Sequence, residues 1–75
     1  MALRFGKCLL RDVRTRAGFT QEALSNSLLS DLGLRISEKS ISKYENNHLT
    51  MNPVIMRGIC IILGCSEFDL YEWPR

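Results

Sequence analysis

The sequence is poor in the residue types from which metal and redox sites are built. Histidine occurs once, at His48, and the three cysteines, Cys8, Cys60 and Cys65, form no CxxC pair and are odd in number. A structural zinc site needs a set of suitably spaced cysteine and histidine ligands. We therefore expect no metal and no cofactor. Each cysteine lies in an apolar stretch, where cysteine behaves as a small hydrophobic residue, so we expect buried structural thiols.

The sequence also lacks a long apolar run. The longest, residues 58–65, is far shorter than the roughly 20 residues that cross a bilayer. Charged residues interrupt the N-terminal stretch MALRFGKCLLRDVR, which therefore lacks the pattern of a signal peptide. These absences predict no membrane association and a cytoplasmic location. We expect the 75 residues to form one domain, 1–75, with no room for a ligand-sensing domain and hence no small-molecule ligand.

No arrangement of residues indicates catalysis. A nucleophile needs a base within reach and a group that orients the base. The only histidine lies in a polar loop, and the cysteines have no obvious neighbouring base. No glycine-rich phosphate loop follows a strand, because no segment has strand periodicity. We expect that the protein is not an enzyme.

Apolar residues recur at helical spacing between capping residues, which predicts an all-α fold of five short helices. The expected ranges are 4–17, 20–33, 37–47, 53–63 and a short last helix capped by Ser66. The residues expected to cap or end the first four helices are Gly18, Thr20, Gly33, Ser37, Asn52 and Gly64. The fourth helix is apolar on most of its circumference and should be the central core helix. In the last helix, Phe68 and Tyr71 should face inward.

The stretch SEKSISKYENN, residues 37–47, has the pattern of a helix with a narrow buried stripe and a wide hydrogen-bonding face. Ile41 and Tyr44 supply the stripe. A helix in the DNA major groove presents the side chains of its N-terminal end to base edges. Here those would be Glu38 and Lys39, with Ser42 and Lys43 one turn further on. The alternative is an ordinary solvated helix with a mixed-charge face, and the residues alone leave both possibilities open.

Groups that would meet phosphates lie on either side of this stretch. Gln21 opens the second helix and would direct its amide, and the N-terminal backbone N–H groups, toward a phosphate. Asn46, Asn47 and His48 would meet the DNA backbone on the other side. The net charge of +2 is unevenly distributed, because residues 1–19 hold five cations against Asp12 alone: Arg4, Lys7, Arg11, Arg14 and Arg16. This basic first helix favours an anionic partner, although basic faces are commonly only solvated.

Four segments in order resemble the Cro/C1-type helix-turn-helix family. They are LRDVRTRAG at 10–18, FTQEAL at 19–24, ISKYE at 41–45 and LGCS at 63–66. The resemblance implies a five-helix, lambda-repressor-like domain that binds double-stranded operator DNA as a homodimer on a palindromic site. It also implies a small bacterial or phage transcriptional regulator, with repression favoured over activation.

The resemblance assigns DNA-binding roles along this pattern. It implies that Gln21 lies on the DNA, and that bases are read by Glu38 and Lys39, with Ser42 and Lys43 behind them. We count Ser37 and Ser40 among the DNA-binding residues as well. It also implies a salt bridge between Arg14 and Glu45, with Arg14 near a phosphate. Two unrelated surface charges would be the plain alternative for that pair.

The chain departs from the family pattern at two places. About six extra residues lie between Asn26 and Ile36, most simply as about one and a half extra turns on the second helix. They could touch DNA, touch a partner subunit or lengthen the core. Asn47 replaces the usual glycine, and we expect its side chain near a phosphate.

A second function is open on the same fold. The chain could be a protein-interaction module, such as an antitoxin or adaptor that binds a partner protein. The aromatic residues of the C-terminal segment, Phe68, Tyr71 and Trp73, would form its contact patch. Core packing of Phe68 and Tyr71 is the competing interpretation.

Overall fold

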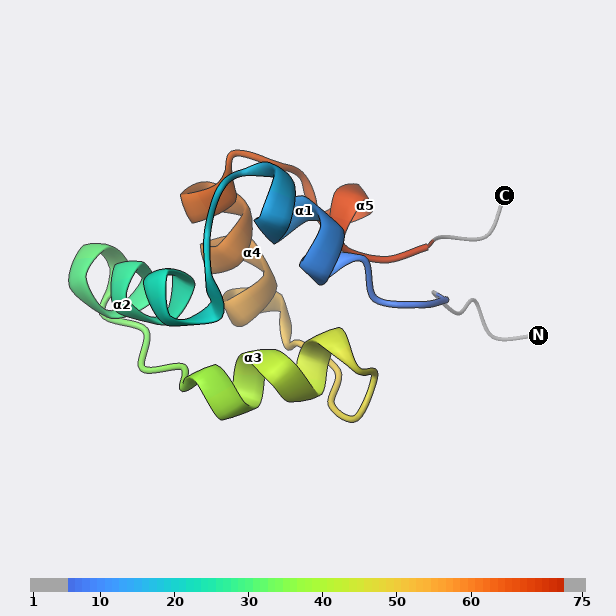
Figure 1. Ribbon diagram of the computed structural model, residues 1–75, viewed down its shortest axis with the longest axis horizontal. Coiled ribbons are helices and arrows are strands. Elements are labelled where there is room, and N and C mark those ends of the chain that lie inside the picture. Colours follow the sequence, from blue (N-terminus) through green and yellow to red (C-terminus); the bar gives the residue numbers. More distant parts are fainter. Residues whose placement is uncertain (1–5, 73–75) are drawn as a thin grey trace.

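The structure is a computed structural model that describes residues 6–72, and the expected contact residue Trp73 lies outside this range. The described chain forms five helices: α1 (Leu10–Arg16), α2 (Gln21–Leu32), α3 (Glu38–Glu45), α4 (Pro53–Leu63) and α5 (Glu67–Leu70) (Figure 1). The expected all-α class is thereby confirmed for these residues. None of their helices is long and apolar enough to cross a membrane.

The helix boundaries follow from local capping, as the sequence predicts. The side chains of Thr20, Ser37 and Asn52 each accept a hydrogen bond from the backbone N–H three residues later, at the starts of α2, α3 and α4. Gly33 and Gly64 end α2 and α4 with φ values of 67° and 71°. That left-handed conformation is inexpensive for glycine and stops the helix.

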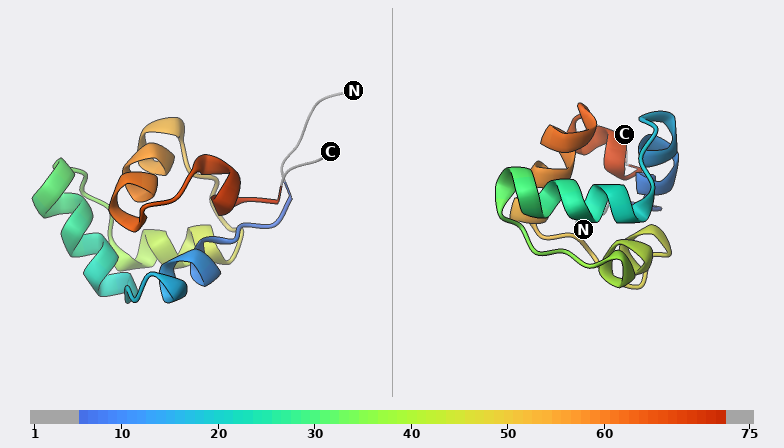
Figure 2. Two further views of the ribbon diagram at one scale, coloured as in Figure 1. Left: turned by 90° about the horizontal axis from the view of Figure 1, so that it is seen from above. Right: turned by 60° about the vertical axis from the view of Figure 1, so that its left-hand side comes forward.

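Every helix contributes at least one side chain to a single core. The largest fully buried side chains are Leu10 of α1, Leu24 and Leu28 of α2, Ile41 of α3, Ile59 of α4 and Leu70 of α5. Helix α2 packs against both α3 and α4, and α1 packs against α3 and α5. Two views place α3 along one edge of the molecule, with the other helices on its inner side (Figures 1 and 2).

The prediction for the first helix was wrong at its start. Helix α1 begins at Leu10, and the described residues before it are not helical and lie beside the C-terminal segment (Figure 1). Cys8 forms an antiparallel bridge with Tyr71, and the Leu9 N–H donates to the Leu70 carbonyl at 2.7 Å. The N–H groups of Cys8 and Leu9 therefore donate to partners that are distant along the chain rather than within a helical turn. We call residues 6–9 and 70–72 the terminal ladder.

Two expectations about apolar faces also need correction. Phe68 does not face inward, because 74% of its surface is exposed, whereas Tyr71 is buried as expected. Helix α5 is a single turn, and the backbone at Tyr71 is extended (φ −140°, ψ 155°), so helical periodicity does not continue between the two aromatic residues. Helix α4 is only partly central, since Val54 and Ile61 are 64% and 55% exposed.

The extra residues of the 26–36 segment lie in α2 and in the connection to α3. Helix α2 has 12 residues and continues to Leu32, which is partly buried against the core. In the connection, Leu34 and Ile36 pack against the same core, as predicted. The Ser25 hydroxyl donates to the Ile36 carbonyl at 2.5 Å and ties the connection back to α2. Leu32, Leu34 and Ile36 of this segment therefore add to the core, next to the start of α3.

Candidate nucleic-acid interface

Helix α3 has one buried face and one exposed polar face. Ile41, Tyr44 and Glu45 are buried. Glu38, Lys39 and Lys43 are exposed, and the two serines between them, Ser40 and Ser42, are half-buried. The expected narrow apolar stripe is confirmed. Helix α3 itself lies along one edge of the molecule (Figure 1).

The N-terminal end of α3 is rigidly held while its long side chains remain available. The Ser37 hydroxyl accepts the Ser40 backbone N–H at 3.1 Å and also contacts the Ser40 hydroxyl at 3.2 Å. The side chains of Glu38 and Lys39 make no hydrogen bond or ion pair with any other residue of the described range. The expected base-reading positions therefore combine a fixed backbone with side chains free to meet a ligand.

A buried carboxylate fixes the other end of α3 to the first two helices. The Glu45 side chain is fully buried, and its Oε2 accepts a hydrogen bond from Arg14 Nε at 2.6 Å. Its Oε1 accepts from Arg14 Nη2 at 3.3 Å and from Gln21 Nε2 at 3.0 Å. Arg11 Nε lies 3.5 Å from the same oxygen. The expected Arg14–Glu45 salt bridge is confirmed, and it belongs to the interior rather than to the surface.

These contacts set the protonation of Glu45. Burial alone would raise the pKa of its carboxyl group, because it disfavours the charged form. The hydrogen bonds from Arg14 and Gln21, with the charge of Arg14, outweigh burial and hold the pKa of Glu45 below its ordinary value of 4.5. The carboxylate is therefore ionised at neutral pH and is matched by donors on α1 and α2.

The same contacts change the roles of Arg14 and Gln21. The Arg14 guanidinium also donates to the Phe19 carbonyl at 2.8 Å, and only 13% of its side chain is exposed. Arg14 therefore positions α3 and is a poor candidate for the expected phosphate contact. Gln21 gives one amide hydrogen to Glu45. Its expected phosphate contact would use the second amide hydrogen and the N-terminal N–H groups of α2.

The residues after α3 are partly engaged within the protein. Asn46 Nδ2 donates to the Ser42 carbonyl at 2.9 Å. Asn47 has a φ of 62°, the left-handed conformation expected for a glycine replacement. Its Oδ1 accepts the Cys8 backbone N–H at 2.8 Å, which joins α3 to the terminal ladder. His48 is exposed. Asn47 thus has a structural role that the sequence did not reveal.

Arg11 is a residue of this region that the sequence did not single out. Its Nη2 donates to Asn46 Oδ1 at 3.2 Å, although 59% of its side chain is exposed. The spacing in the sequence already indicated this position, since Arg11 lies three residues before Arg14 and residues three apart lie on the same face of a helix. Arg11 and Arg14 accordingly both point toward the C-terminal end of α3.

Comparisons with protein-family models, with curated proteins and with solved structures found no match for this chain. The resemblance to the Cro/C1-type family therefore rests on the four sequence segments.

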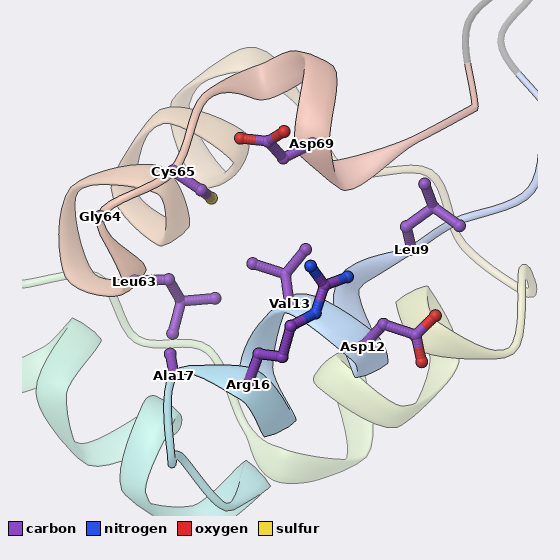
Figure 3. A pocket seen from close by; sticks show the side chains of 9 residues that line it. All are labelled: Leu9, Asp12, Val13, Arg16, Ala17, Leu63, Gly64, Cys65 and Asp69. Carbon is purple, nitrogen blue, oxygen red and sulfur yellow. The ribbon is translucent and has the colours of Figure 1, made fainter.

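A hollow of about 420 Å³ lies between α1 and the end of α4 (Figure 3). Cys65, Asp12 and Asp69 are among its lining residues. The Asp69 carboxylate accepts the Ser66 backbone N–H at 3.0 Å, so it caps α5. Burial raises the pKa of the Cys65 thiol, which disfavours the nucleophilic thiolate. The hollow therefore does not pair a reactive nucleophile with a free base.

Cys8 and Cys60 are buried, as predicted, whereas Cys65 is only partly buried. Burial, with the neighbouring Cys65, raises the pKa of Cys60 to about 12, and burial also raises the pKa of Cys8. Within residues 6–72, no group of three or more histidine, cysteine or acidic side chains is placed to hold a metal ion.

Proposed function

We propose that this protein is a sequence-specific double-stranded DNA-binding regulator with a lambda-repressor-like helix-turn-helix, in which α3 enters the major groove. The observation that carries the proposal is the anchoring of α3. Its buried face is locked through Glu45 to α1 and α2, while Glu38, Lys39 and Lys43 stand exposed on the opposite face. A recognition helix needs this combination of a fixed backbone and free polar side chains.

The exposed side chains suit the edges of base pairs. Lys39 and Lys43 can donate to guanine O6 and N7, and Glu38 can accept from the cytosine amino group. The hydroxyls of Ser37, Ser40 and Ser42 can donate or accept. Gln21, Asn46 and His48 lie on the adjoining segments, where contacts with phosphates would set the register of α3.

The regulator would act by occupying its operator, which most directly gives repression. We propose a homodimer, because a palindromic operator matches a two-fold protein with half-sites one helical turn apart. Sedimentation of the free protein and of its DNA complex tests this. A monomer at every concentration that also binds DNA one to one would contradict the symmetric arrangement.

Binding to duplex DNA from the protein's own promoter region, titrated at several salt concentrations, tests the function itself. Contacts with phosphates release counterions, so the affinity should fall steeply and log-linearly with salt. A duplex carrying an inverted repeat should bind more tightly than a scrambled duplex of the same composition. No binding to either duplex would refute the proposal.

Lys39→Ala is the sharpest test of base reading. We expect it to relax the preference at one base pair of each half-site and to cost about 1–3 kcal/mol for the preferred base. Affinities for operators with each base substituted in turn provide the measurement. An equal loss of affinity for every sequence would instead identify Lys39 as a phosphate contact.

A second candidate, the protein-interaction module, is favoured by one surface. Beside the connection between α2 and α3, Leu32 and Leu34 line an open apolar groove with Val54 and Ile61 of α4. Leu29, one turn before the end of α2, is 48% exposed. Exposed apolar patches of this kind commonly mark protein contacts. An antitoxin or adaptor would use such a surface to bind its partner.

Copurification of the tagged protein from its host separates the two candidates. A stoichiometric protein partner that is lost in Val54→Lys and Ile61→Lys variants, together with no shift of any duplex, would favour the interaction module. DNA binding that both variants retain would favour the regulator.

A further inference from the structure

The base-reading face of α3 is flanked at both ends by an exposed arginine outside the set predicted from the sequence. We propose that Arg35 and Arg11 hold operator phosphates, one at each end of α3. The inference rests on the proposed DNA-binding function and adds two contacts with the sugar–phosphate backbone.

Arg35 lies at the N-terminal end of α3. Its neighbours Leu34 and Ile36 pack against the core, while Arg35 between them is exposed. It lies two residues before the cap residue Ser37, so their Cα atoms are at most about 7 Å apart. The hydrogen bond from Ser25 to the Ile36 carbonyl holds this part of the chain. The backbone on either side of Arg35 is therefore anchored to the core.

The Arg35 side chain is available for an anion. It forms no hydrogen bond or ion pair with any residue in the described range 6–72. A guanidinium group presents five N–H donors in a planar fork, which matches two oxygens of one phosphate. When α3 lies in the major groove, the segment leading into it must pass close to the strand that borders the groove.

Arg11 lies at the opposite end of α3, where Asn46 and Glu45 hold it. Because Arg14 already compensates the Glu45 carboxylate, Arg11 brings surplus positive charge to this end of the helix. It lines a small hollow of about 120 Å³ together with Lys7, Cys8, Leu9, Asp12 and Glu45. Lys7 and Asp12 bring opposite charges to its lining, and the Glu72 carboxylate accepts the Lys7 backbone N–H at 3.0 Å. Contacts through Nε and Nη2 leave donors of Arg11 available to a phosphate.

The test compares three substitutions that remove the same charge: Arg35→Ala, Arg11→Ala and the control Arg57→Ala. Arg57 lies on α4, 66% of its side chain is exposed, and its Nη1 is 3.5 Å from Glu67 Oε1. The probe is the promoter duplex, titrated by fluorescence anisotropy over a series of salt concentrations. The slope of log affinity against log salt is negative. We expect its magnitude to decrease by about 0.9 when either flanking arginine is replaced and to stay unchanged for the control.

Three further readouts make the result decisive. The loss of affinity should be equal across operator base substitutions, because phosphates carry no sequence information. Arg11→Lys should retain the salt slope, which separates the charge from the hydrogen bond to Asn46. Thermal unfolding by circular dichroism shows whether each variant is folded, and a folded variant with a wild-type slope would overturn the proposal for that arginine. An equal loss in Arg57→Ala would overturn it for both, whereas a wild-type protein that binds no duplex would refute the proposed function itself.

Discussion

At the scale of single residues, Glu45 has the greatest influence on how the candidate interface is presented. Its carboxylate is fully buried and joins α3 to side chains of α1 and α2. Removing one partner of a buried ion pair leaves the other without compensation, which is far costlier than losing a surface pair. Glu45, which the family resemblance paired with Arg14, therefore holds α3 to α1 and α2 from the interior of the protein.

Glu45→Gln should destabilise the protein by about 3 kcal/mol at neutral pH, because Arg14 then lacks its carboxylate in a largely buried setting. The folded-state pKa of Glu45 lies below 4.5. The stabilisation that the ionised Glu45 carboxylate contributes is therefore fully present above that value. It is lost as the pH falls through the folded-state pKa. Urea unfolding of both proteins from about pH 7 to about pH 3 should show the wild-type advantage shrinking only at the acid end.

Glu38→Gln is the matched control, since Glu38 is exposed and forms no ion pair in the described range. It should change the free energy of unfolding by no more than about 0.5 kcal/mol. An advantage of Glu45 that persists unchanged into acid would show that its ionisation does not support the fold.

At the scale of elements, local signals predicted α2, α3 and α4 well and α1 poorly. The caps of those three helices are bonds between residues three apart, which a sequence displays directly. The start of α1 is decided by Leu70 and Asn47, which are remote along the chain. The sequence did not reveal the hydrogen bonds that Gln21 makes with Glu45 and Asn47 with Cys8. The reason is the same, because these partners come from other elements.

The connection between α2 and α3 packs closely against Gly58 of α4. A Cβ atom on Gly58 would lie 2.5 Å from Leu34 Cδ1 and 3.4 Å from Leu32 Cδ1. Gly58→Val should therefore push the connection away from α4 and cost about 1–3 kcal/mol, as expected for overpacking. Chemical denaturation would measure this cost.

Val54→Ala, on an exposed position of the same helix, should cost no more than about 0.5 kcal/mol and serves as its control. If Gly58→Val also lowers DNA affinity while the protein stays folded, the close approach helps to place α3. Wild-type stability in Gly58→Val would mean that Leu34 moves aside without cost.

At the scale of the whole molecule, the terminal ladder connects both ends of the described chain to the candidate interface. Residues 6–9 pair with residues 70–72, and Cys8 also donates its backbone N–H to Asn47 at the end of α3. The Tyr71 hydroxyl accepts the buried Met51 backbone N–H at 3.2 Å, so the ladder also holds the loop that follows α3. The position of α3 thus depends on residues from both ends of the chain.

Asn47→Gly isolates this connection. Glycine adopts the left-handed conformation readily, so the main loss is the acceptor for the Cys8 N–H, at about 1–3 kcal/mol. Asn47→Ala should be worse, because it adds a backbone penalty of about 1–2 kcal/mol. In thermal unfolding, the wild type should have the highest melting temperature, followed by Asn47→Gly and then by Asn47→Ala. The control variant His48→Ala should melt close to the wild type.

Hydrogen exchange at Cys8 provides the direct readout. Its amide proton should exchange more rapidly in Asn47→Gly than in the wild type, while the amide protons of α2 and α4 change less. Equal protection of Cys8 in both proteins would mean that Asn47 does not hold the ladder.

The ladder also bears on chain connectivity. The Gly6 backbone N–H donates to the Glu72 carbonyl, so the two ends of the described chain are neighbours in space. A short peptide could join them, and the chain could be reopened in the exposed segment at 48–50. Such a circular permutant would keep all five helices in place but begin just after α3. We therefore expect the arrangement of the helices in space to tolerate a change in their order along the chain.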